Sequence, residues 1–202
     1  MTEKEVIEVS EMDCSLFGRP CIGEPVSGDT AIICKSEDEL FLAIVDVLGH
    51  GREAHVVARR SEDFLRENWD SDIAITLTAL HAELKGSRGA AVGLAHLDVN
   101  TRKLAYIGVG NTVVRIFGNQ PMRLFSHDGI VGVNFHVPTV QSLQLSESDV
   151  AIFHTDGIRE SFTMQEYPQI MDHSAPSIAR SVVQRFGKTY DDATCIALRY
   201  KQ

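Results

Sequence analysis

The chain has 202 residues, of which 44% are hydrophobic, enough for one well-buried core and too few for two independent domains. We therefore expect a single domain over residues 1–202. Its 28 acidic residues outnumber the 19 Lys and Arg residues, and the resulting net charge of -9 repels a phosphate backbone. This balance excludes nucleic acid as a partner.

The N-terminal residues are acidic and lack the basic and apolar segments of a signal peptide. No apolar run approaches the ~20 residues needed to span a bilayer. The four cysteines form no CxxC pair, and a chain of this size does not depend on disulfides. These features predict a cytoplasmic protein without membrane contact, whose thiols are reduced and buried.

The hydrophobic pattern predicts the following elements in chain order. Two β-prone runs separated by turn residues predict antiparallel strands at 30–34 and 40–45. Helical spacing of apolar residues then predicts two consecutive amphipathic helices, at 52–69 and 73–84. Strand character returns afterwards, with predicted strands at 91–97, 104–109, 113–117, 139–145 and 149–154. A helix at 176–187 and a strand at 193–200 close the chain.

The order of these elements indicates the fold class. Strands come first, then two helices, more strands, one helix and one strand. A doubly wound parallel fold would alternate strand and helix throughout. The sequence therefore predicts an α+β fold, a layered sandwich with antiparallel sheets.

Four aspartates stand where strands should end or turns begin. They are Asp29 in SGDT, Asp46 in AIVDVLGHG, Asp156 in AIFHTDGIRE and Asp191 in YDDAT. A carboxylate at the end of a buried strand is held rigidly, and hard cations such as Mg²⁺ or Mn²⁺ prefer oxygen ligands. Converging carboxylates would repel one another, and a metal ion removes that repulsion. The four positions are therefore candidate metal ligands.

Each aspartate taken alone also has a structural interpretation. Asp29 and Asp191 suit ordinary turns or helix caps, and Asp156 begins an Asp-Gly pair that is common in turns. Asp46 is harder to explain in this way, because it directly follows the apolar run 41–45 and needs a partner or a metal if it is buried.

The glycines after Asp46 support a site at this position. Gly49 and Gly51 permit tight turns that let the main chain approach a metal or a phosphate closely. Ligation by the backbone carbonyl near Val47 is consistent with this geometry.

With these residues in view, the chain resembles the metal-dependent PPM phosphatases (type 2C), and within them the bacterial SpoIIE-like branch. The motifs SGDT, VDVLGHG, TDGI and DDAT occur in the order typical of the family and cover nearly the whole chain. The segments YIGVGNTVVRIFG and SHDGIVGVNF between them resemble those of small stand-alone phosphatases of the stressosome pathway. The resemblance implies a four-layer α-β-β-α sandwich with two Mn²⁺ or Mg²⁺ ions at one end of the sheets.

Carried over residue by residue, the resemblance implies a ligand set. Asp46 would bridge the two metals, the Val47 carbonyl would bind one of them, and Asp156 and Asp191 would bind the other. Asp29 would act close to the centre through a water. The chain departs from many relatives in having Val47 where they have glycine, which a carbonyl ligand tolerates unless the backbone needs a positive φ.

Two further assignments concern the choice between Asp191 and Asp192 and the role of His50. Adjacent residues point in different directions, so we favour Asp191 as the ligand and leave Asp192 in a supporting position. His50, between two glycines, has two open roles: it could give a proton to the leaving alkoxide or orient a metal-bound water, or it could make a structural hydrogen bond to a neighbouring loop. Asp46 and His50 are the predicted catalytic residues. Asn111 is expected to shape a turn beside the site.

The resemblance implies a monomeric protein-serine/threonine phosphatase whose partners are phosphorylated STAS-domain proteins of the stressosome or a partner-switching pathway. One alternative is a phosphatase of a phosphorylated anti-anti-sigma factor. Another is a non-catalytic module of the same fold that binds phosphoproteins, although the retained Asp46, Asp156 and Asp191 argue against it. A receiver-like signalling domain fits poorly, because its alternating strand-helix order is missing.

Overall fold

The computed structural model describes residues 6–9, 12–163 and 165–200. All paired strands run antiparallel, in two sheets. The first sheet has the strand order β1-β2-β11-β10-β7-β8, formed by β1 (Val6–Val9), β2 (Met12–Arg19), β7 (Val113–Phe117), β8 (Met122–Leu124), β10 (Val150–His154) and β11 (Ala193–Tyr200). The second has the order β3-β4-β5-β6-β9, formed by β3 (Asp29–Ser36), β4 (Glu39–Val47), β5 (Ala90–Asp98), β6 (Lys103–Val109) and β9 (Gln141–Gln144).

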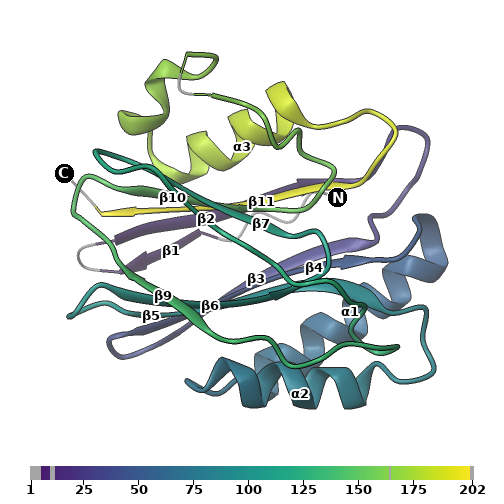
Figure 1. Cartoon of the computed structure of the whole chain (residues 1–202). Helices are drawn as coiled ribbons and strands as arrows, with labels where there is room; N and C mark the ends of the chain where they lie inside the picture. The colour runs from purple at the N-terminus through teal and green to yellow at the C-terminus, as the bar shows by residue number, and fades with distance from the viewer. Residues whose placement is uncertain (1–5, 10–11, 164, 201–202) are drawn as a thin grey trace.

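Helices cover the outer faces of both sheets (Figure 1). The helices α1 (Gly51–Asn68) and α2 (Ile73–Glu83) pack on the second sheet, and α3 (Ala175–Phe186), preceded by the 3₁₀ turn η1 (Pro168–Met171), packs on the first. The result is the four-layer α-β-β-α sandwich, which confirms the predicted fold class.

The period-two pattern of β4 explains why this strand lies in the middle of the structure. Leu42 and Ile44 face the core between the two sheets, whereas Phe41 and Val45 face the core under α1 and α2. Successive side chains of a strand point to opposite faces, so an unbroken apolar run is stable only where both faces are covered. Asp46 comes at the end of this run and is placed at the edge of the buried layers.

A third core lies between the first sheet and α3, with Phe162 at its centre. The Phe162 ring stacks on Phe186 at 4.7 Å and on Phe117 at 5.6 Å between ring centroids. The guanidinium of Arg115 lies 4.4 Å from the centre of the same ring. The loop after β10 is thereby fixed against α3.

The helices and most of the strands agree with the predicted ranges to within a few residues. The strands β1, β2 and β8 were not predicted. β8 has three residues, too few for a periodic signal, and β2 carries polar residues between its buried ones. One of them, Asp13, has a tertiary role, because its carboxylate accepts a hydrogen bond of 2.7 Å from the Ala175 N–H at the start of α3.

The cysteines are free, as predicted, and Cys14, Cys21 and Cys195 are buried while Cys34 is half-buried. Among the described residues, none of the helices combines the length and the hydrophobicity that crossing a bilayer requires.

The Phe162 cluster gives a first prediction. Phe162→Ala removes a fully buried ring that three neighbours contact, so we expect the free energy of unfolding to fall by about 3–5 kcal/mol. Urea unfolding followed by circular dichroism measures the change as a lower midpoint with an unaltered slope. The exposed Val56→Ala on α1 serves as the control and should change stability by less than about 0.5 kcal/mol. A loss below about 1 kcal/mol for Phe162→Ala would show that the loop after β10 repacks without this ring.

Candidate metal centre

Four carboxylates from the ends of four strands meet at one end of the sandwich. Asp29 begins β3 and lies directly opposite Asp46 of β4 in the sheet register. Asp156 follows β10 and Asp191 precedes β11, and these two strands pair antiparallel, so their adjoining ends lie side by side. The charges of Asp156 and Asp191 both act on Asp46. The structure therefore brings all four predicted aspartates together, two from each sheet.

The pKa of the Asp46 carboxyl lies far above its usual range. Burial raises its pKa to about 8, with further increases from the negative charges of Asp156, Asp191 and Asp192. A side-chain hydrogen bond with Asp156 also favours the protonated form of Asp46. In the metal-free chain these effects favour a proton on Asp46, with the Asp156 carboxylate as its acceptor.

Asp29 is fixed by a hydrogen bond that crosses from one sheet to the other. Its Oδ2 accepts from the Thr155 hydroxyl at 2.8 Å, and the Thr155 oxygen in turn accepts from the Thr194 N–H at 3.1 Å. Burial and then the charge of Asp46 raise the pKa of Asp29 well above its usual range, although the bond from Thr155 opposes the shift. Thr155 therefore sets the distance between the two halves of the site.

Asp156 is oriented by a side chain for which only a turn role was predicted. Asn111, exposed after β6, donates from Nδ2 to Asp156 Oδ2 at 2.7 Å. Burial and then the charge of Asp191 raise the pKa of Asp156, while nearby Lys188 lowers it. The glycine-flanked GNT segment indicated a loop here, but the contact joins residues 45 positions apart and has no local signal.

Asp191 and Asp192 have different surroundings. Both carboxylate oxygens of Asp192 accept backbone hydrogen bonds, from the Cys21 N–H at 2.8 Å and from the Gly28 N–H at 2.7 Å. The Asp191 carboxylate accepts from the N–H of Asp192 through Oδ1. Asp192 thus holds the β2–β3 connection in place.

The turn after β4 carries the other two predicted site residues. Val47 has a negative φ, unlike Gly49 at +84° and Gly51 at +76°, so the valine in place of the family's glycine introduces no strain at this position. His50 is exposed, and its Nδ1 lies 2.8 Å from Oε1 of Glu24. Gly51 suits this position because its φ of +76° is one that residues with a side chain rarely adopt. His50 therefore makes the hydrogen bond to a neighbouring loop, and its ring remains open to solvent.

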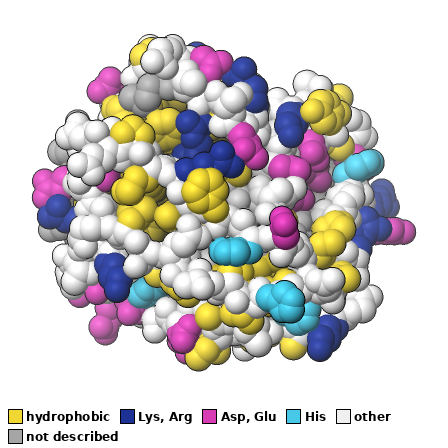
Figure 2. Space-filling view, viewed as in Figure 1, with side chains coloured by type: hydrophobic (Ala, Val, Ile, Leu, Met, Phe, Trp, Pro, Cys, Tyr) yellow, Lys and Arg dark blue, Asp and Glu magenta, His cyan; other side chains and the backbone are white. Residues whose placement is uncertain are grey.

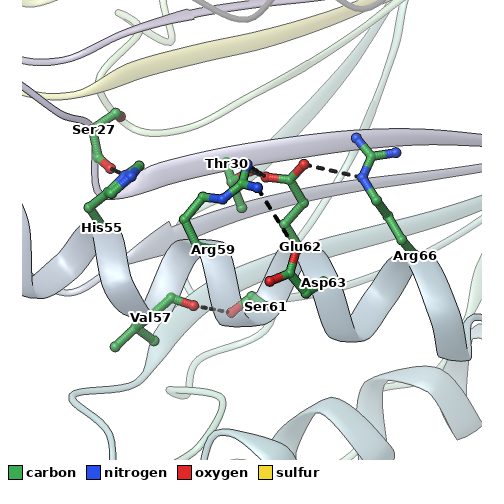
Figure 3. Close-up of polar contacts among 9 residues, drawn as sticks. All are labelled: Ser27, Thr30, His55, Val57, Arg59, Ser61, Glu62, Asp63 and Arg66. Carbon is green, nitrogen blue, oxygen red and sulfur yellow. Dashed lines mark hydrogen bonds and ion pairs between the residues drawn. The ribbon is translucent and has the colours of Figure 1, made fainter. Parts of the chain in front are cut away.

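Helix α1 is tied to the strand that carries Asp29 (Figure 3). Glu62 is buried on α1, and its Oε2 accepts from the Thr30 hydroxyl at 3.1 Å. Arg59 and Arg66 donate to the same carboxylate at 2.8 and 3.1 Å. A groove of about 270 Å³ opens beside these residues, with Asp29 in its wall. The position of Asp29 is thus coupled to the position of α1.

Arg19 does not reach toward the carboxylates with its guanidinium. Its Nη2 donates to the Lys188 carbonyl at 2.7 Å, and its Nη1 donates to the carbonyls of Pro20 and Asp191 at 3.0 and 3.3 Å. These bonds hold the β2–β3 and α3–β11 connections together.

The donor set suits a hard divalent cation. It consists of carboxyl groups whose pKa values rise because they are buried and because like charges crowd together, and a bound cation would offset that repulsion. In the described ranges, no three Asp, Glu, His or Cys side chains are placed closely enough to coordinate one metal ion without other ligands. Mg²⁺ in particular keeps several waters and uses few carboxylates, so solvent would complete its coordination.

Several solved structures have the same fold as this chain over nearly its whole length. A solved structure described as the bacterial stressosome, a modular system adapted to control secondary messenger signaling, has a chain that is 26% identical with a TM-score of 0.86, covering 93% of this chain and 99% of that one. RsbX in complex with magnesium has a TM-score of 0.81 at 20% identity, covering 98% and 100%. The catalytic domain of the serine/threonine phosphatase PstP, in complex with two manganese ions, has a TM-score of 0.69 at 12% identity, covering 95% and 99%.

In sequence, the chain is 25% identical over 89 residues to phosphoserine phosphatase RsbX of Bacillus subtilis (strain 168). That match covers 44% of this chain and 45% of RsbX, so it spans less than half of the length of that relative.

These likenesses define the fold as that of the PPM (PP2C) phosphatases, relatives of which bind Mg²⁺ or Mn²⁺. The family described as Stage II sporulation protein E (SpoIIE) matches residues 36–201, and the chain belongs to this family. The matched region contains Asp46, Asp156 and Asp191, whereas Asp29 precedes it. The predicted resemblance is confirmed.

The pKa of Asp46 predicts how the stability of the metal-free protein depends on pH. The folded chain holds this proton up to about pH 8, whereas the unfolded carboxyl loses it near 3.8, so the free energy of unfolding falls as pH rises between these values. We expect a fall of about 2 kcal/mol between pH 6.5 and 8 in the presence of EDTA, measured by urea unfolding. Asp46→Asn should flatten this slope.

The pH range of this measurement begins at 6.5 so that the titration of a second group, His154, does not contribute to the slope. Burial lowers the pKa of His154 to about 4, so its contribution to stability is lost as pH falls from 6.5 toward 4, in the opposite sense to that of Asp46. A slope above pH 6.5 that is equally steep in wild type and Asp46→Asn would assign the proton to another residue.

Proposed function

We propose that the chain is a metal-dependent protein-serine/threonine phosphatase that uses two Mn²⁺ or Mg²⁺ ions. The observation that carries the proposal is the convergence of Asp29, Asp46, Asp156 and Asp191 from the strand ends of both sheets, with the pKa of Asp46 raised to about 8. Such crowding destabilises a folded protein unless cations or protons offset it. Membership in the SpoIIE family supports the same chemistry.

The residues would divide the work as follows. Asp46 would serve both ions, the Val47 carbonyl would hold one, Asp156 and Asp191 would hold the other, and Asp29 would act through a water. When bound, the two cations supply an activated water and neutralise the phosphate oxygens. Asn111 orients Asp156 and Thr155 orients Asp29 through their hydrogen bonds.

Two of the four cysteines, Cys21 and Cys195, are poorly suited to act as the nucleophile. Burial raises the pKa of the Cys195 thiol, and burial together with the charge of Asp192 raises that of Cys21. Neither is a thiolate near neutral pH, the form that attacks phosphorus in Cys-dependent phosphatases. This supports attack by water over a covalent cysteine mechanism.

His50 is proposed as the proton donor to the leaving alkoxide. It stands at the start of α1 with its ring exposed, and the bond from Nδ1 to Glu24 orients the ring. With Nδ1 engaged by Glu24, a proton on Nε2 would be the one delivered to the leaving group.

The proposed substrates are phosphoserine or phosphothreonine residues on STAS-domain proteins of a stressosome or partner-switching pathway. Similarity to a chain of the bacterial stressosome and to phosphoserine phosphatase RsbX supports this choice. A phosphorylated anti-anti-sigma factor, the substrate class of an RsbU-like phosphatase, is the second candidate, and dephosphorylation assays on both partner types separate them. We place the protein in the cytoplasm, as a monomer.

The activity itself is tested with Mn²⁺ and p-nitrophenyl phosphate. We expect Mn²⁺-dependent hydrolysis that falls at least about 100-fold in Asp46→Asn and in Asp156→Asn, because each change removes a carboxylate from the proposed ligand set. Asp63→Asn, at an exposed position on α1, is the matched control and should retain the wild-type rate. Folded wild-type protein that neither turns over nor binds Mn²⁺ in calorimetry would favour the non-catalytic binding module.

The role of His50 is tested by comparing leaving groups. His50→Gln should lower kcat about 100-fold or more on a phosphoserine peptide, whose alkoxide needs a proton, and far less on p-nitrophenyl phosphate, whose phenolate leaves without one. If His50 served only to hold the loop through Glu24, both substrates would lose the same factor and Glu24→Gln would reproduce it.

A further inference from the structure

Two large hydrophobic side chains stand in solvent beside the candidate metal centre. Ile22, in the β2–β3 connection, is 76% exposed, and Tyr190, immediately before Asp191, is 75% exposed. These are the highest exposures among the large hydrophobic residues in the described part of the chain. A single exposed apolar residue needs no explanation, but two on adjoining loops beside a reactive site indicate a contact surface.

The backbone beneath both side chains is held in place. The Ile22 N–H donates to the Thr189 carbonyl at 2.9 Å, which joins the two loops directly. On either side of this bond, Arg19 donates to the Lys188 carbonyl and Asp192 accepts from the Cys21 N–H. Ile22 and Tyr190 are therefore presented from a fixed platform, so ordering them against a partner costs little backbone entropy.

The figures show the setting of this platform. The β2–β3 connection and the α3–β11 connection lie at the same end of the sandwich in Figure 1. At the upper right of Figure 2, acidic, basic and hydrophobic side chains lie next to one another. Lys188, whose charge lowers the pKa of Asp156, lies on the same loop as Tyr190. An apolar contact and a cation thus flank the carboxylates.

Charge explains why an apolar contact is needed here. A phosphorylated segment is anionic, and the chain has a net charge of -9, so long-range attraction does not bring the two together. Screening limits electrostatic contacts to within about 8 Å at physiological ionic strength. Recognition beyond the phosphate itself must then come from short-range burial of apolar surface, for which tyrosine is well suited.

We propose that Ile22 and Tyr190, called here the apolar rim, are specificity-determining residues that contact apolar side chains next to the phosphorylated residue of the substrate protein. This inference rests on the proposed function, because it takes the phosphate to lie at the four carboxylates. It narrows the substrate class to phosphoserine or phosphothreonine segments with apolar flanking residues.

The test uses two synthetic phosphoserine peptides that differ only in the residues on each side of the phosphoserine, Leu in one and Ser in the other. We expect wild type to favour the Leu-flanked peptide by about tenfold in kcat/KM, the order of magnitude typical of one apolar contact. Tyr190→Ser and Ile22→Ser should each reduce that preference, and the double variant should abolish it, with the change carried mainly by KM.

The matched controls are Val56→Ser and Ile75→Ser, which remove apolar side chains 67% and 58% exposed on α1 and α2. They should keep the tenfold preference. The rate on p-nitrophenyl phosphate provides the reference for each variant. A preference that persists in the double variant, or a rim variant that loses the same factor on both peptides and on p-nitrophenyl phosphate, overturns the inference.

The failure of the proposed function has a different signature, namely no turnover of any substrate by wild type. The rim is then tested by fluorescence anisotropy with the labelled Leu-flanked peptide. Weaker binding by Tyr190→Ser than by wild type or Val56→Ser supports the rim as a docking surface, and equal binding overturns it. If size-exclusion chromatography shows a dimer that Tyr190→Ser dissociates, the rim is a self-association surface and the inference is also overturned.

Discussion

Repulsion between carboxylates is the constraint on which the rest of this structure depends. Asp29 and Asp46 face each other across neighbouring strands, and the charges of Asp156 and Asp191 reach Asp46 from the other sheet. In partly buried surroundings such charges cannot all exist together without a proton or a cation to offset them. A scaffold that holds them there anyway must be stiff, and three apolar layers between two sheets and their covering helices provide that stiffness.

Hydrogen bonds from polar side chains to the carboxylates add to the rigidity of the site. Asn111 holds Asp156, and Thr155 holds Asp29. Asp192 uses its own carboxylate differently, to fix the loop that begins after β2. Each of these contacts joins distant parts of the chain, so the geometry of the site is a property of the whole sandwich. The attachment of Thr30 to Glu62 extends this network to α1.

Much of the fold followed from the sequence, because the apolar runs of β4 and the helical spacing in α1 are local signals. The four aspartates were also visible, since each lies at or beside the end of a strand. β2 was hidden by polar residues such as Asp13, whose purpose is to cap α3. Asn111 was expected only to shape a turn, because its bond to Asp156 exists only after β6, β7 and β10 have come together. The features that the sequence did not predict, β2 and the role of Asn111, therefore depend on tertiary contacts.

Each sheet contributes half of the proposed ligands. Asp29 and Asp46 belong to the second sheet, Asp156 and Asp191 adjoin strands of the first, and Thr155 joins the halves. The site is incomplete as long as only one of the two sheets has formed. If the four carboxylates hold metal ions as proposed, competence to bind them would arise only when the sandwich closes, and a nascent or partly unfolded chain would be inactive until it has finished folding.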